Sequence, residues 1–257
     1  MDTILLNAMF VGSYGEKNID GEIINFYLDD NGFQNYFIPE HGTLPIEIQN
    51  DNIKAILMIS KIDGDTFESL GKWGIPLVKK QYVSLTDLQM IACSDTKAND
   101  RTENIAKGVH FFVDDYRFEG IYTHPERTLS KYSQYAFLLT PDFSTYADMD
   151  LWRQLESVAK NRWVGAYWQS NGLTVVPTIS WSTPRSFEFC FDGVEQNAAV
   201  AISTLGCKKA KLQFMRGYDV MLEKLQPEAI LCFGDPLTEM QGNIISVNYR
   251  ESRKVVR

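Results

Sequence analysis

Six apolar runs recur along the second half of the chain, and longer, more polar stretches separate them. The runs cover residues 108–113, 136–140, 174–180, 198–204, 229–234 and 243–248. Their apolar residues are continuous rather than alternating with polar ones, which is typical of strands buried on both faces. The pattern therefore predicts an α/β protein with parallel strands joined by crossover segments.

Two of the separating stretches have the periodicity of amphipathic helices. We expect one helix over residues 149–170, with Asp148 as its N-cap and Gly172 at its end, because apolar residues recur along one stripe. We expect the second over residues 212–225, where Pro227 marks the end.

The first hundred residues predict shorter strands. A strand is expected at residues 4–11, followed by a hairpin over residues 22–40 that turns at Asn31-Gly32, because Asn-Gly readily adopts the positive backbone angles of tight turns. Apolar runs at residues 54–60 and 75–78 resemble the start of a β/α alternation, with a short helix near residues 66–73 between them.

Together with the six later runs, residues 54–60 and 75–78 make eight candidate strands, the number in a (β/α)8 barrel. An open, doubly wound sheet accommodates the same strands, and we favour the barrel slightly. The predicted organisation is a strand-rich N-terminal extension, residues 1–52, and a parallel β/α domain, residues 53–257. A polar stretch places the alternative boundary near residue 100.

The charge of the chain is divided unevenly. Its 25 basic and 33 acidic residues give a net charge of −8, which argues against nonspecific binding to nucleic acid or to an anionic membrane. Residues 1–107 hold most of the acidity (9 basic against 16 acidic), whereas residues 108–257 are almost neutral (16 against 17). The basic tail that begins at Arg250 is either a solvated end or a contact for phosphate. A small phosphate-bearing ligand therefore fits the charge distribution.

The four cysteines indicate a reducing compartment. Cys93, Cys190, Cys207 and Cys232 are widely spaced, which excludes the paired cysteines of a zinc ribbon or a C-x-x-C redox motif. The sequence shows no secretory signal, and its apolar runs are far shorter than the roughly 20 residues of a membrane span. We therefore expect a cytoplasmic protein without a membrane partner.

Acidic residues follow two of the predicted strands, at the ends where parallel α/β proteins place their functional sites. Asp114 and Asp115 come after the run at 108–113, and Asp142 comes after the run at 136–140. All three are candidate catalytic acids or bases, and Asp114 and Asp142 are candidate ligands of Mg²⁺ or Mn²⁺. Alternatively, these aspartates cap helices and hold loops.

Candidate ligand-binding residues lie near the same strand ends. The guanidinium groups of Arg117, Arg162 and Arg185 match the geometry of phosphate or carboxylate, although Arg162 could instead form a structural ion pair with a strand-end aspartate. Trp181 either stacks on a base or sugar or belongs to the core, and Ser203 lies near the end of its strand.

The segment at residues 186–193 alternates phenylalanines with polar residues. Glu188, on the polar side of this alternation, is a further candidate catalytic acid or base. An edge strand or hairpin closed by Asp192-Gly193 explains the same alternation without chemistry.

Several motifs of known chemistry are absent from the sequence. The three histidines have no metal-ligand spacing, and the chain has no Walker loop, no dinucleotide-binding glycine motif and no nucleophile elbow. ATP-dependent, Rossmann-cofactor and lipase-type activities therefore have little support.

Seven stretches between residues 108 and 234 carry a family resemblance. They are GVHFFVDDYRFE, LLTPDFSTYADM, NRWVGAYWQSNG, VVPTISW, SFEFCFDG, VAISTLGC and AILCFG. In this order they resemble the domain of unknown function family 4417, which occurs mostly in bacteria, phages and other mobile elements. The resemblance implies a β/α domain with polar strand ends, but neither a substrate nor a mechanism.

Two kinds of function fit these residues, so whether the protein is an enzyme stays open. The first is a metal-assisted hydrolase of a phosphodiester or nucleotide. The second is a binding module without turnover that recognises a nucleotide, a peptide, or a host or phage protein. The acidic residues 1–107 would suit a further interaction role.

Overall fold

The computed structural model describes residues 67–254 and, before them, the backbone of five short strands. The chain divides into two compact units, residues 1–61 and 62–257. Each unit is described by itself. The predicted domain boundary between residues 52 and 53 falls outside the described residues and stays a prediction.

In the first unit, three antiparallel strands contain the predicted hairpin. Strand β3 (Glu22–Leu28) pairs with β4 (Gln34–Tyr36) on one side and with β2 (Tyr14–Ile19) on the other. The pairing of β3 with β4 confirms the hairpin, and the turn predicted at Asn31-Gly32 lies outside the described residues. Strand β2 was not predicted, because its sequence YGEKNI is largely polar.

Two very short strands also belong to the described part of this unit. Strand β1 (Thr3–Ile4) pairs antiparallel with β5 (Ile38–Pro39). The rest of the strand predicted at residues 4–11 lies outside the described residues, as does the apolar run at residues 54–60.

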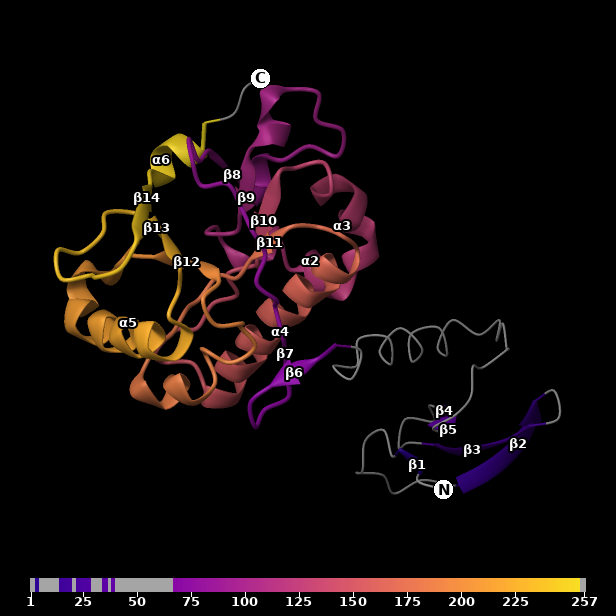
Figure 1. Cartoon of the computed structure of the whole chain (residues 1–257). Coiled ribbons are helices and arrows are strands. Elements are labelled where there is room, and N and C mark those ends of the chain that lie inside the picture. The colour runs from indigo at the N-terminus through magenta and orange to yellow at the C-terminus, as the bar shows by residue number, and fades with distance from the viewer. Residues whose placement is uncertain are drawn as a thin grey trace. The chain divides into compact units, whose positions relative to one another are not determined.

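Seven parallel strands form the centre of the second unit (Figure 1). They are β8 (Met90–Ala92), β9 (Gly108–His110), β10 (Phe137–Leu139), β11 (Val175–Val176), β12 (Ala199–Ser203), β13 (Ala229–Phe233) and β14 (Ile244–Val247). One ladder joins β8 to β11 and another joins β12 to β14, and a parallel bridge between Thr178 and Ala201 connects the two. The parallel α/β class is therefore confirmed.

The order of these strands distinguishes the two predicted architectures. Each strand from β8 to β14 lies beside its neighbour in sequence, and the order never reverses. A doubly wound sheet reverses its order at a switch point, whereas a barrel does not. The arrangement agrees with the barrel-like alternative.

The continuous apolar runs are explained by burial on both faces of the strands. An inner cluster draws side chains from all seven strands or the two residues after them: Met90, Phe112, Phe137, Leu139, Val176, Ala199, Ala201, Ala229, Leu231, Phe233 and Val247. Ile230 and Cys232, between inner residues of β13, pack instead in an outer cluster with helix residues. Successive strand side chains point to opposite faces, so one run supplies both clusters.

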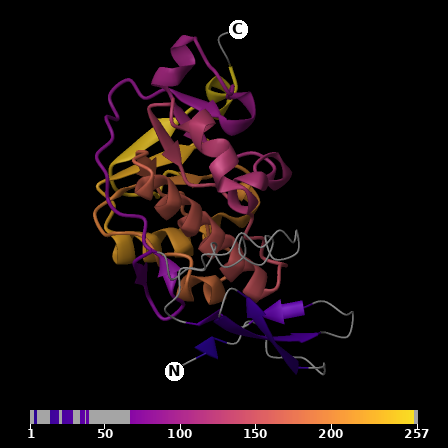
Figure 2. The ribbon, with the colours of Figure 1, turned by 90° about the vertical axis from the view of Figure 1, so that its right-hand side faces the viewer.

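The two predicted long helices cover the outer side of this sheet. Helix α4 (Leu151–Ser170) crosses the strands in Figure 2, and α5 (Lys211–Leu225) packs against β12 and β13. Both helices are confirmed, but Asp150 rather than Asp148 occupies the N-cap of α4, without a side-chain capping bond. Helix α4 ends before Gly172, whose positive φ of 79° turns the chain.

Short helices accompany the long ones. They are α2 (Gly120–Thr123), α3 (Pro125–Tyr132) and α6 (Tyr249–Ser252). Among the described residues no ladder joins β14 to β8; instead α6 follows β14 and packs against β8. The C-terminal helix thus occupies the interval between the first and last parallel strands.

The predicted start of the β/α alternation is wrong in its details. Strand β7 (Ile75–Pro76) pairs antiparallel with β6 (Ser69–Leu70) and does not join the parallel sheet. The expected helix near residues 66–73 is replaced by this hairpin, because Gly71 and Gly74 adopt the positive φ angles of a tight turn.

Strand β8 is the first parallel strand among the described residues. Its sequence, MIA, was missed because only three apolar residues form the strand and polar segments flank it. The polar stretch near residue 100 links β8 to β9 within one sheet.

The edge strand predicted at residues 186–193 is also wrong. Pro184–Glu188 form a 3-10 helix, and the chain then turns through Gly193, whose φ is 70°. Phe189, Cys190 and Phe191 are all buried, so the alternation in the sequence is not an alternation of faces.

Candidate functional site

A pocket of about 530 Å³ opens at the carboxyl ends of the parallel strands. It is lined by residues after β9, β10, β11 and β12 and by the C-terminal residues. Six of the predicted site residues contribute to it: Asp114, Asp115, Arg117, Asp142, Trp181 and Ser203. Strand ends far apart in sequence therefore meet here, as the parallel topology requires.

Asp142, three residues beyond Leu139 at the end of β10, has the most perturbed carboxyl group of this pocket. Its burial, together with the negative charge of Asp115, raises its pKa from 3.8 to about 7, while a hydrogen bond with the Ser180 side chain opposes the rise. A carboxyl group with this pKa exchanges its proton near neutral pH, which suits acid or base catalysis.

Asp115 begins the short 3-10 helix Asp115–Arg117 and is held by one residue of the β10 loop. The Ser144 backbone N–H donates to Asp115 Oδ2 at 3.0 Å, and the Ser144 hydroxyl donates to Oδ1 at 2.9 Å. Both carboxylate oxygens are thereby fixed, so Asp115 ties the β9 loop to the β10 loop beside Asp142.

Asp114 is exposed. Its carboxylate lies 3.6 Å from Arg117 Nε in an ion pair, and the Arg117 guanidinium lies over the Tyr116 ring. Exposed ion pairs of this kind hold little energy, so Arg117 stays available to an anionic ligand.

Trp181 forms an aromatic wall of the pocket. Its indole N–H donates to the Phe214 carbonyl at 3.2 Å, and its ring centroid lies 5.0 Å from that of Phe214. Gly217 of α5 leaves room for this ring, because a Cβ at that position would overlap the indole. The ring is therefore positioned by α5 rather than by its own loop.

Ser203 and Cys207 line the side formed by the end of β12. The Leu205 backbone N–H donates to Ser203 Oγ at 3.1 Å, so this hydroxyl shapes the loop as well as facing the pocket. Burial and the charge of Asp142 raise the pKa of the Cys207 thiol, which argues against a thiolate nucleophile here.

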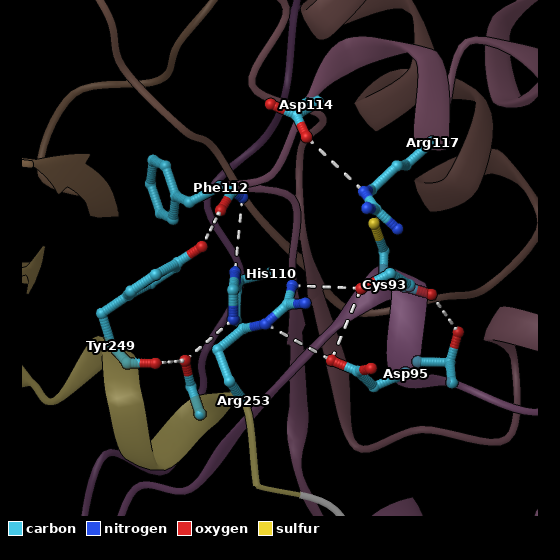
Figure 3. Close-up of polar contacts among 11 residues, drawn as sticks. Cys93, Asp95, His110, Phe112, Asp114, Arg117, Tyr249 and Arg253 are labelled. Carbon is cyan, nitrogen blue, oxygen red and sulfur yellow. Dashed lines mark hydrogen bonds and ion pairs between the residues drawn. The ribbon is translucent and has the colours of Figure 1, made fainter.

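The C-terminal residues add two side chains that were not predicted as site residues. The Tyr249 hydroxyl donates to the Phe112 carbonyl at 3.0 Å, and Arg253 lies 3.6 Å (Nε) from Asp95 Oδ2 (Figure 3). Arg253 Nη1 also donates to the Ser94 hydroxyl at 3.1 Å. The sequence indicated Arg253 only as one residue of the basic tail. Nothing in the sequence predicted that this tail packs back against the sheet.

Three predicted site residues lie outside the pocket lining. Glu188 is exposed and pairs with Lys72 at 2.9 Å, and Arg185 is exposed on the same 3-10 helix. Arg162 is buried in α4 and donates to the carbonyls of Thr178, Cys190 and Asp192 rather than to a strand-end aspartate. Burial lowers the pKa of Arg162 to about 10, so it remains charged and holds the 190–192 turn.

The carboxyl groups do not gather into a metal cage. Within the described part of the chain, no group of three or more histidine, cysteine, aspartate or glutamate side chains is arranged to hold a metal ion. Mg²⁺ often uses only one or two protein carboxylates and completes its shell with water and substrate phosphate. A cation at Asp142 would therefore require oxygen atoms from the ligand.

Across residues 67–254, no helix is both long enough and apolar enough to cross a bilayer.

Two phage proteins are similar to the chain. The Gene 1 protein of Mycobacterium phage L5 is 38% identical over 172 residues, which make up 66% of this chain and 74% of that protein. The Gene 1 protein of Mycobacterium phage D29 is 44% identical over 129 residues, which make up 49% of this chain and 48% of that protein. No solved structure matches the chain significantly.

The family resemblance expected for residues 108–234 is confirmed and extends further in both directions. The matched region, residues 67–250, includes all seven parallel strands and the strand-end aspartates. The chain belongs to the domain of unknown function family DUF4417.

Proposed function

We propose that the strand-end pocket is the active site of a hydrolase that acts on a small phosphate-bearing ligand such as a nucleotide, with Asp142 as its general acid. The observation that carries this proposal is the Asp142 carboxyl group, which lies in a pocket of about 530 Å³ and has a pKa of about 7. General acids work best when their pKa is close to the working pH.

The other pocket residues suit this ligand. Arg117 and Arg253 provide guanidinium groups that pair with phosphate, and Trp181 provides an aromatic face for a base or sugar. An anionic ligand would raise the pKa of Asp142 further and keep its proton in place. The protonated form is therefore the one that meets the substrate.

The proposed reaction is the hydrolysis of a phosphate ester bond. The oxygen of water bonds to phosphorus and the ester P–O bond breaks. The leaving oxygen takes the proton of Asp142, and a proton of the attacking water returns the carboxyl group to its starting form. Burial and the charge of Asp115, which Ser144 holds in place, raise the pKa of Asp142.

Mg²⁺ or Mn²⁺ remains part of the proposal only as an ion bound together with the ligand. The candidate ligands Asp114 and Asp142 do not belong to a three-residue metal group among the described side chains. No step of the hydrolysis above is therefore routed through a metal ion.

The experiment is a turnover screen of nucleotides and phosphodiesters, with and without Mg²⁺ or Mn²⁺. We expect the wild type to hydrolyse at least one compound, with a rate that falls above pH 7, and we expect Asp142→Asn to lose that activity. Glu188→Gln is the matched control, because this carboxylate is exposed and lies outside the pocket lining. Equal activity in both variants would exclude Asp142 as the acid.

A second candidate function is a binding module without turnover. It is favoured by the fact that both carboxylate oxygens of Asp115 are already bonded to Ser144. The ligand would be a nucleotide, a peptide, or a host or phage protein. Ligand binding by wild type and Asp142→Asn alike, without hydrolysis by either, would select this function.

We also propose that the protein works in the cytoplasm. All four cysteines are free in the structure, and three of them are buried. Reduced thiols are the rule in that compartment. Fractionation of expressing cells tests this location directly.

A further inference from the structure

A second, larger pocket lies next to the site pocket, at the carboxyl ends of β12, β13 and β14. Its volume is about 980 Å³, and it shares Leu205 and Tyr249 with the site pocket. We propose that this second pocket binds the terminal phosphates of a ligand that carries two or more phosphate groups and whose reacting bond lies beside Asp142. The inference rests on the proposed function, because it assigns the class and direction of the same ligand.

Basic side chains dominate the charge of the second pocket. Lys209, Lys211 and Arg250 line it, against the single carboxylate of Asp235. Lys211 is paired with Glu239 at 2.5 Å. Among the described side chains, no carboxylate forms an ion pair with Lys209 or Arg250, and both are exposed. These two cations are therefore the ones that a polyphosphate would neutralise.

The backbone of this pocket permits close approach of a ligand. Gly206 and Gly234 follow β12 and β13 with positive φ angles of 78° and 98°. A Cβ at position 234 would lie 2.7 Å from Thr204 Oγ1, so a larger residue would disturb the wall between the strands. Bare backbone at such turns is a common lining for phosphate groups.

The opposite side of the site pocket has the opposite charge. A hollow of about 530 Å³ there is lined by Asp114, Asp115, Asp148 and Asp150, with Arg153 as its basic residue. Its carboxylates would repel a polyphosphate, whereas the second pocket would attract one. This asymmetry directs the terminal phosphates toward β12–β14 and away from the acidic hollow, while the reacting phosphate lies beside Asp142 in the site pocket.

The test measures binding of inorganic pyrophosphate and inorganic phosphate to the full chain by calorimetry. We expect pyrophosphate to bind more tightly than phosphate, and we expect Lys209→Gln and Arg250→Gln each to weaken pyrophosphate binding by about tenfold, because each removes one charged contact. Lys80→Gln is the control for the loss of one positive charge. Lys80 pairs with Glu228, which precedes β13 at the other end of the sheet.

Two results would overturn the inference: pyrophosphate binding no tighter than phosphate binding, or pyrophosphate binding by the Lys209 and Arg250 variants that equals binding by the Lys80 variant. Melting temperatures of all variants identify any loss of folding, and the exposure of Lys209 and Arg250 makes such a loss unexpected. Asp142→Asn is measured alongside and should still bind pyrophosphate. Failure of the hydrolysis screen would thus leave the binding result interpretable by itself.

Discussion

His110 of β9 and Ser252 of α6 are joined by a buried hydrogen bond of 2.9 Å between Nε2 and Oγ, across 142 residues of sequence. The Phe112 N–H donates to His110 Nδ1 at 3.3 Å, so Nε2 carries the ring proton and donates to Ser252. The Ser252 hydroxyl in turn donates to the Tyr249 carbonyl at 2.8 Å. Burial and the charge of Arg253 lower the pKa of His110 to about 3, so the ring is neutral and the bond fastens α6 at neutral pH.

Removing the Ser252 hydroxyl should therefore loosen the helix that carries Tyr249 and precedes Arg253. Ser252→Ala leaves a buried N–H of His110 without an acceptor, and we expect the free energy of unfolding to fall by about 1–3 kcal/mol. Urea unfolding measures this loss, and hydrogen exchange at residues 249–253 should become faster. Ser170→Ala is the control, because its hydroxyl donates to a helix carbonyl at an exposed position. A Ser252 variant that behaves like the control would show that the bond does not hold α6.

The pKa of Asp142 predicts how stability depends on pH. Its folded-state pKa of about 7 lies above the ordinary 3.8 of an unfolded chain, so folding favours the protonated carboxyl group. This stabilisation is complete below pH 3.8 and is lost as the pH rises through 7. Asp142→Asn should therefore be more stable than the wild type at pH 8 by roughly 1–3 kcal/mol, after allowance for solvent screening, and similar to it at pH 4.

The measurement for Asp142 is urea unfolding of both proteins across this pH range. Glu188→Gln should show no such pH-dependent gain, because Glu188 is exposed and its pKa is lowered by Lys72 rather than raised. An Asp142→Asn curve parallel to the wild-type curve from pH 4 to pH 8 would contradict a raised pKa.

Gly217 provides a test of how Trp181 is held. Gly217→Ala places a methyl group in the space of the indole ring, and we expect a loss of about 1–3 kcal/mol in stability together with a shift in tryptophan fluorescence. Ligand stacking in the site pocket should weaken as the ring moves. Gly120→Ala in α2 is the control, since nothing lies within 4 Å of its added Cβ. If both variants leave fluorescence and stability unchanged, α5 does not position Trp181.

The parallel sheet was predictable because β9 to β13 are largely buried on both faces, so each of them needs a continuous run of apolar residues. Strand β8 (Met90–Ala92) escaped prediction because polar segments flank its few apolar residues. The apolar runs that contain β9 and β11, by contrast, extend beyond these short strands. The hairpin of β6 and β7 escaped because two glycine turn conformations, at Gly71 and Gly74, decide it and the apolar pattern does not.

The strand-end aspartates were predictable as neighbours, because parallel strands bring their carboxyl ends to one edge. The different surroundings of Asp115 and Asp142 were not predictable, because the Ser144 bonds to Asp115 and the burial of Asp142 depend on how the loops pack. Arg162 was a plausible ligand contact by residue type, yet its place within α4 turns it toward backbone carbonyls. Arg253 reaches the pocket only because α6 returns to β8.

Asn161 is the residue by which α4 holds the loop that carries Asp142. It is buried, and its side-chain amide donates to the Pro141 carbonyl at 2.7 Å and to the Thr178 carbonyl at 3.3 Å. Asn161→Ala removes one of two donors to each carbonyl, because the Phe143 N–H also donates to Pro141 and Arg162 also donates to Thr178. Since two buried hydrogen bonds are lost, we expect a loss of about 1–3 kcal/mol in stability. Because Pro141 directly precedes Asp142, the carboxyl group should also become more exposed to water.

Greater exposure would lower the pKa of Asp142 toward its ordinary value, so the pH at which turnover falls should move below 7 in Asn161→Ala. A loss of folding alone would reduce the amount of active protein without moving this pH profile. Asn171→Ala is the matched control, because its amide donates to the Tyr167 carbonyl at 2.8 Å at the exposed end of the same helix. An Asn161 variant that is less stable but keeps the wild-type pH profile would show that Asn161 supports the fold without positioning Asp142.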